Sequence, residues 1–113
     1  MIAPFLIISL GTAAGVSWTT YGGPFLYTSA NWSASSQFFF EAYFRASAGT
    51  CLARLVNQSG TPVSGSEIST TSATHVRLRS SALTLVDGDT YFAQFGEDVG
   101  ATGFFLLARV IGI

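Results

Sequence analysis

The sequence predicts an all-β protein, a single-domain antiparallel β-sandwich of the jelly-roll type with about eight or nine strands. In residues 37–46, QFFFEAYFRA, the even positions are all apolar, while the odd positions include every polar and charged side chain. This period of two is typical of a strand with one buried face. Short runs rich in β-formers recur between clusters of Gly, Ser, Thr, Pro and Asp, and no helical period is sustained, which favours a sandwich. A chain of 113 residues suits one domain, residues 1–113.

Each element follows from this alternation and from the turn residues between the runs. A short connection at Ala48-Gly49 predicts a hairpin between the two long central strands, with Cys51, Ala53 and Leu55 pointing inward. The last strand is apolar on both faces except for Arg109, which is typical of a strand that is central or covered by a neighbour. We expect strands near 4–10, 15–20, 24–28, 37–46, 50–57, 66–71, 74–80, 89–95 and 104–111.

The apolar N-terminal segment, residues 1–10, is either a core strand or an arm that adds a strand to a neighbouring subunit. No Lys or Arg precedes Arg45, so the positive region of a signal peptide is missing and a strand is favoured. No apolar stretch reaches the roughly 18 residues of a transmembrane helix. We therefore expect no membrane partner.

The low charge content of the chain indicates which kinds of partner it could bind. Charged residues make up 10% of the chain, against roughly 25% in ordinary soluble domains. Five basic residues nearly balance six acidic ones, so we expect no field of one sign and no nucleic-acid partner. A surface so poor in charge predicts self-association as a homo-oligomer.

Catalytic and metal chemistry is not indicated. The single histidine, His75, lies beside two arginines that disfavour its protonated form, and no G-x-S-x-G motif is present. One His and one Cys are too few for zinc, and the acidic residues near 87–89 and 97–98 flank opposite ends of one expected strand, too far apart for calcium. Glu41 is expected to pair with Arg54 or Arg109. We expect no enzyme activity, no metal and no cofactor.

Aromatic density in residues 18–32, WTTYGGPFLYTSANW, leaves three uses open. These rings could pack at the core or rim of the sandwich, form a subunit interface, or stack on sugars. Two residues of the final strand and one near the N-terminus join them as candidates. The interface or ligand-contact candidates are Phe5, Trp18, Tyr21, Phe25, Tyr27, Trp32, Phe105 and Leu107.

The order of motifs after Phe38 resembles small jelly-roll domains of tailed-phage structural proteins. The resemblance covers about two thirds of the chain, FEAYFRASAGTCLARLVNQSGTPVSGSEISTTSATHVRLRSSALTL followed by DGDTYFAQFG and ARVIGI. Its recognisable pieces are residues 53–57, 63–72 and 76–85. Such sandwiches are also similar to carbohydrate-binding modules.

This resemblance implies a non-enzymatic virion structural protein, a capsid decoration protein or a head or tail accessory protein, located in the virion. Its partners would be copies of itself and a major capsid or other virion protein, and on a capsid closed symmetry would favour a homotrimer. The alternative is a carbohydrate-binding module or glycan-recognising adhesin domain, extracellular and with a glycan partner. A third interpretation is an extracellular filament or surface-layer subunit.

Overall fold

The computed structural model of the chain describes residues 2–3, 11–14, 18–98 and 101–113. Within them it contains nine strands and one short 3-10 helix, and no helix long and apolar enough to cross a membrane. The elements are β1 (Ile2–Ala3), β2 (Gly11–Ala14), β3 (Thr19–Leu26), η1 (Ser29–Asn31), β4 (Phe38–Ala48), β5 (Cys51–Asn57), β6 (Ile68–Thr70), β7 (Val76–Arg79), β8 (Thr90–Glu97) and β9 (Thr102–Gly112).

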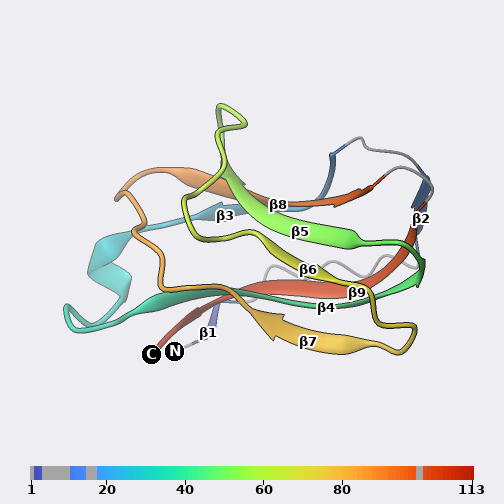
Figure 1. Cartoon of the computed structure of the whole chain (residues 1–113). Helices are drawn as coiled ribbons and strands as arrows, with labels where there is room; N and C mark the ends of the chain where they lie inside the picture. The colour runs from blue at the N-terminus through green and yellow to red at the C-terminus, as the bar shows by residue number, and fades with distance from the viewer. Residues whose placement is uncertain (1, 4–10, 15–17, 99–100) are drawn as a thin grey trace.

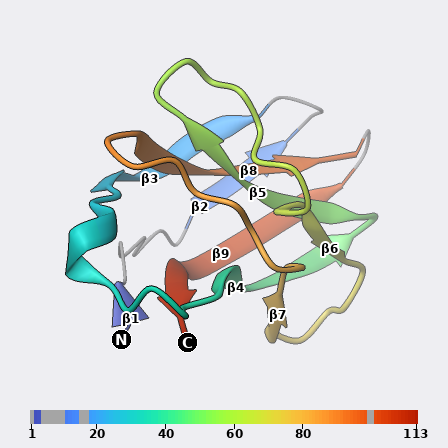
Figure 2. The ribbon, with the colours of Figure 1, turned by 90° about the vertical axis from the view of Figure 1, so that its left-hand side faces the viewer.

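The strands form two antiparallel sheets that pack face to face as a jelly roll (Figure 1). Sheet A has the order β1-β9-β4-β7, with β2 also pairing with β9, and sheet B has the order β3-β8-β5-β6. Most consecutive strands therefore lie in opposite sheets, which is the jelly-roll arrangement. β1 pairs with the end of β9, which brings the two ends of the chain together (Figure 2). The predicted fold class is confirmed.

The core lies between the two sheets, and the alternation of β4 defines one side of it. The even residues of β4 from Phe38 to Ala46 are all buried, as the sequence predicts. Phe44 packs against Phe105 of β9 and against Phe95 of β8, with ring centroids 6.1 and 6.0 Å apart. The opposite side of the core comes from the inward residues of sheet B, which are Cys51, Ala53, Leu55, Tyr91, Ala93 and Phe95.

The predicted hairpin at Ala48-Gly49 is wrong. β4 pairs with β7 and β9, whereas β5 pairs with β6 and β8, so the short connection carries the chain from one sheet to the other. Gly49 has φ +67°, and a side chain there would press on Ala101. A tight turn of this kind can close a hairpin or cross between sheets, and the hydrophobic pattern on either side is the same in both cases.

The N-terminal strands also differ from the expectation. The segment expected at 4–10 lies outside the described residues, and the one expected at 15–20 is described only from Trp18 onward. β3 runs from Thr19 to Leu26, through the predicted break near residue 22, and its pairing with β8 shifts register twice. β9 lies between β4 and β1/β2, so the prediction of a central position for the last strand is confirmed.

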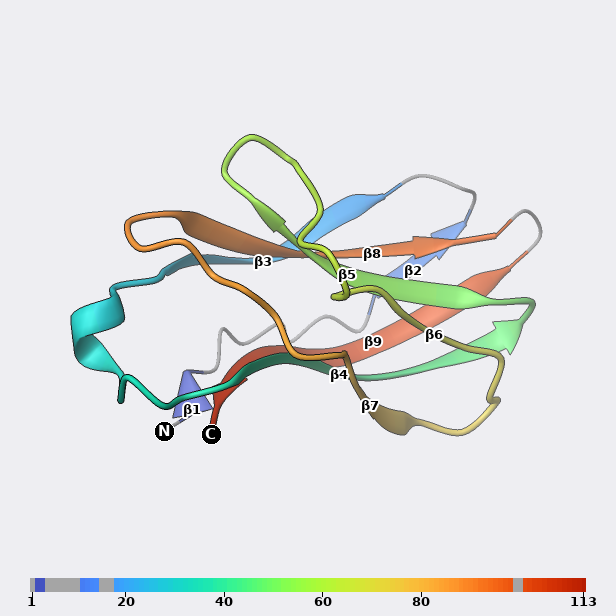
Figure 3. The same ribbon diagram turned by 60° about the vertical axis from the view of Figure 1, so that its left-hand side comes forward.

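Aromatic side chains close one end of the sandwich, where η1 carries the chain from β3 in sheet B towards β4 in sheet A (Figure 3). The Trp32 ring lies edge-on to Phe38 at 5.0 Å and to Phe25 at 6.4 Å. Tyr27, only 8% exposed, meets Phe38 at 5.2 Å. Three of the candidate contact residues therefore pack at this rim.

Cys51 is a free, fully buried thiol in this core. Burial raises its pKa to about 11, and the negative charges of Glu97 and Asp98 act in the same direction. A thiol with so little thiolate at neutral pH is inert, so Cys51 behaves as a small core side chain.

We predict that Gly103→Ala destabilises the protein by about 1–3 kcal/mol. A Cβ at Gly103 would lie 2.7 Å from Cys51 Sγ and from Phe105 Cζ, inside the core. The free energy of unfolding in urea measures the loss. Gly96→Ala is the matched strand control, because its Cβ would meet the partly exposed Trp18 ring at 3.0 Å. An equal loss in both variants would contradict the packing argument.

Candidate functional site

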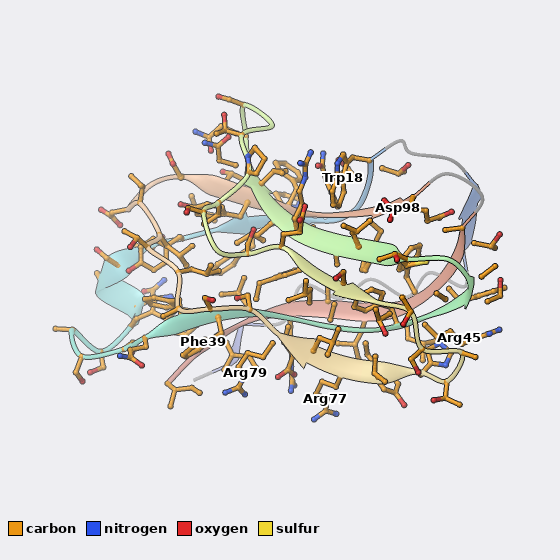
Figure 4. The ribbon with its side chains drawn as sticks, in the orientation of Figure 1. Trp18, Phe39, Arg45, Arg77, Arg79 and Asp98 are labelled. Atoms are coloured by element: carbon orange, nitrogen blue, oxygen red, sulfur yellow. The ribbon has the colours of Figure 1, made fainter. Side chains whose placement is uncertain are left out.

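The odd residues of β4 point away from the core and form the centre of an outward surface on sheet A. β7 and β9 flank β4 and add their own outward residues in matching rows. We call this surface the arginine face, since four of the five arginines of the chain lie on it. Figure 4 labels three of them, Arg45, Arg77 and Arg79. Its members are Phe39, Glu41, Tyr43, Arg45, His75, Arg77, Arg79, Phe104, Leu107 and Arg109.

Glu41 is the organising group of the arginine face. Its pairing partners are Arg79 on β7 and Arg109 on β9, so a carboxylate stands between two guanidinium groups across three strands. Arg109 Nε donates to Oε1 at 2.8 Å, and Arg79 NH2 donates to Oε2 at 3.3 Å. Arg77 approaches at 3.7 Å. The Glu41 side chain is only 4% exposed, so these contacts compensate the loss of its hydration.

Arg45 and Arg77 make no hydrogen bond with Glu41, and each lies beside an aromatic residue. The Arg45 guanidinium stacks over Phe104 at 4.0 Å and donates to the Ala73 carbonyl at 3.4 Å. The Tyr43 ring lies in the next row, 5.4 Å from the His75 ring and opposite Arg77. The arginine face is thus a sheet surface on which partly exposed rings alternate with cations.

Burial and, second, the positive charge of Arg45 lower the pKa of His75. The sequence predicts that the pKa of His75 is lowered, but it assigns the shift to neighbouring arginines alone, whereas burial is the larger cause. His75 Nε2 is buried and finds no hydrogen-bond partner among the described residues. No group there is positioned to make it a general base.

The charge distribution corrects one expectation and refines another. Four arginines and one glutamate give the arginine face a formal charge of +3, while Arg54 and the five other carboxylates carry −4, for the total of −1. The balanced composition therefore conceals a local field of one sign. Glu41 pairs with Arg109, as expected, whereas Arg54 lies in the other sheet. The contacts of Glu41 with Arg77 and Arg79 were not foreseen.

The outward surface of sheet B carries a smaller cluster. The Trp18 ring, labelled in Figure 4, lies on this side of the molecule. It lies against Gly96, and the Arg54 guanidinium lies over it at 3.9 Å. Arg54 Nε donates to Gln94 Oε1 at 3.0 Å. The Trp18 ring is therefore contacted by both Gly96 and Arg54, which reduces its free aromatic surface.

The structure does not bring the sequence-derived candidates into one site. Phe105 is fully buried and is not available for contact, since its ring lies 4.1 Å from that of Phe95. Phe5 lies outside the described residues, and Tyr21 lies in β3 at a position whose side chain is not described. Phe25, Tyr27 and Trp32 pack at the rim. Leu107 lies on the arginine face, opposite Tyr43.

No pocket and no group of three or more His, Cys, Asp or Glu side chains fit to hold a metal ion occurs within the described part of the chain. The carboxylate on the arginine face is already bound to arginines. These residues do not fit a calcium site, and ligand binding here would take place on an open surface.

Comparison with known proteins gives one informative result. No family model and no curated protein matches the sequence. A solved structure described as carbohydrate-binding module CBM36 in complex with calcium and xylotriose matches with a TM-score of 0.58 and 18% identity. The match covers 94% of this chain and 97% of that one. The chain therefore has the fold of that module over almost its whole length.

We predict that Glu41→Gln lowers the free energy of unfolding by about 1–3 kcal/mol, because it leaves Arg79 and Arg109 without their charged acceptor. The loss stays below that of a fully buried pair since the arginine side chains are 24–64% exposed. Arg77→Gln, which removes only the 3.7 Å contact, should cost less than about 1 kcal/mol. Urea unfolding of both variants measures the difference, and equal losses would contradict the central role of Glu41.

We predict that His75 makes the protein less stable as the pH falls below about 6.5. Its pKa is lowered from 6.5 in the folded protein, so below that pH the unfolded chain binds the proton first and the free energy of unfolding declines. His75→Gln should remove this component between pH 7.5 and 5.5, above the range where carboxylates titrate. Urea unfolding at both pH values tests this, and an undiminished decline in the variant would contradict it.

Proposed function

We propose that this protein is a non-catalytic, extracellular glycan-binding module and that the arginine face is its binding surface. The observation that carries the proposal is the position of Tyr43. Its partly exposed ring lies at the centre of the outward face of sheet A, with Arg77 opposite it on β7 and Glu41 two residues away on β4. Sugar recognition needs an apolar ring to pack against the C–H face of a pyranose and fixed polar groups to orient its hydroxyls.

Two further observations support this role. The fold neighbour is described as a carbohydrate-binding module in complex with xylotriose. The arginine side chains are held in place by Glu41 and Phe104 before a ligand arrives. Groups fixed in this way lose less conformational entropy when they bind.

The virion assembly role stays a prediction, and no finding favours it. Among the described residues, the exposed large apolar side chains are three, Leu26, Val86 and Ile113, too few to form a large apolar patch. Assembly by burial of an apolar surface requires a contiguous patch. The partly exposed aromatic and basic groups of the arginine face are better suited to a polar, ring-containing ligand.

Glycan-array screening followed by calorimetry with the best oligosaccharide tests the function. We expect Tyr43→Ala to weaken binding by about tenfold, since the stacked ring contributes on the order of 1 kcal/mol beyond its buried area. Trp18→Ala is the matched control, because Trp18 is also an aromatic next to an arginine but lies on the opposite sheet. Absence of any glycan binding would reject the function. Loss only in Trp18→Ala would reject the arginine face as its site.

A further inference from the structure

The arginine face has an unusual balance of hydrogen-bonding groups. It presents four guanidinium groups, each with five N–H donors, and a single carboxylate. Both oxygens of that carboxylate, Glu41 Oε1 and Oε2, already accept hydrogen bonds from Arg109 and Arg79. Nε2 of His75, which would be an acceptor in one tautomer, is buried. The Tyr43 hydroxyl can donate or accept one further hydrogen bond, so the face has many more free donors than free acceptors.

The donors are accessible. The Arg77 side chain is 64% exposed and the Arg79 side chain 45% exposed. Within the described part of the chain, the Arg77 side chain makes no hydrogen bond, and its one ion-pair contact is with Glu41 at 3.7 Å. Arg79 directs Nε and one terminal nitrogen at Glu41 and has one terminal nitrogen left. Arg45 lies over the Phe104 ring and donates one hydrogen bond to the Ala73 carbonyl, which leaves its other donors free.

Three arginines, the exposed Arg77 and Arg79 and the partly exposed Arg45, follow the strand direction. Arg79 stands in the row of Glu41, Arg77 in the row of Tyr43, and Arg45 in the next row. Outward residues two apart on a strand are separated by about 7 Å, so these rows span about 14 Å along β4. An extended ligand lying along β4 would meet a cation at each step.

A neutral sugar hydroxyl donates as well as accepts, and this surface offers it few acceptors. A carboxylate or sulfate group only accepts, and the planar guanidinium matches it with two parallel hydrogen bonds. The formal charge of +3 on this face, against −4 on the remainder of the molecule, would also orient an approaching anion toward β4 and β7.

From this geometry we propose that the arginine face binds acidic glycans, chains whose sugars carry carboxylate or sulfate groups, along β4. This inference rests on the proposed glycan-binding function and adds the chemical class of the ligand. Tyr43 supplies the ring contact, and Arg45, Arg77 and Arg79 supply the anion contacts.

Matched pairs of polysaccharides test the charge requirement directly. Polygalacturonate is compared with its methyl-esterified form, and dextran sulfate with dextran, by calorimetry or affinity electrophoresis. We expect at least one acidic member to bind at least tenfold more tightly than its neutral counterpart, and the affinity to fall as salt rises from 50 to 300 mM through screening. The two pairs distinguish carboxylate from sulfate as the recognised group.

Variants locate the contact. Arg77→Gln should weaken binding of the acidic glycan about three- to tenfold, since an exposed guanidinium loses a charge-assisted hydrogen bond. Arg45→Gln is a second variant away from the Glu41 network. Arg54→Gln is the control of equal charge on the opposite sheet, and it should change the affinity by less than twofold. Thermal melting of each variant checks that the fold is retained.

The outcomes separate this inference from the function on which it rests. Equal affinity within both pairs, with binding that still depends on Tyr43, would reject the acidic ligand and keep the glycan-binding function. Failure to bind any glycan would reject both. Equal effects of Arg54→Gln and Arg77→Gln would reject the arginine face as the site. Binding of single-stranded DNA as tight as that of the acidic glycan would reject a glycan as the ligand.

Discussion

The opposite environments of the two faces of β4 are the constraint on which the molecule depends. The even residues from Phe38 to Ala46 are buried against sheet B, and this burial holds the two sheets together. Because side chains alternate, the same packing directs Glu41, Tyr43 and Arg45 outward. A shift of one residue in the pairing of β4 would bury a glutamate and an arginine in the core. The register that builds the core therefore also builds the arginine face.

Glu41 extends that constraint to the neighbouring strands. It accepts hydrogen bonds from Arg79 of β7 and Arg109 of β9, 38 and 68 residues away along the chain. β7 is a four-residue edge strand, and these contacts add to its short ladder with β4. The buried Glu41 carboxylate accepts hydrogen bonds from arginines on two different strands, and it keeps both partners in one register only. The ion network therefore favours a single arrangement of the three strands.

The fold could be predicted because the alternation of apolar residues is visible within each strand. The site could be predicted only in part, because it depends on which strands pair and in which register. The inward sets around Phe44, Cys51 and Ala93 follow from alternation, which needs no knowledge of partners. The hairpin at Ala48-Gly49 was wrong because a tight turn does not specify whether the chain stays in its sheet. The basic stripe of Arg77 and Arg79 is visible in the sequence, but Arg45 and Arg109 join it only through the registers of β7 and β9 with β4.

The Glu41 network has opposing effects on recognition. It lowers the formal charge of the face from +4 to +3, which weakens the long-range attraction of an anion. It also holds Arg79 and Arg109 in defined orientations, so a ligand would order fewer side chains on binding. Arg77 touches Glu41 only at 3.7 Å and retains both its charge and its free donors. The face thus combines three guanidinium groups whose donors are partly engaged, those of Arg45, Arg79 and Arg109, with that of Arg77, which donates no side-chain hydrogen bond. Arg77 stands opposite Tyr43, the ring proposed to stack on a sugar.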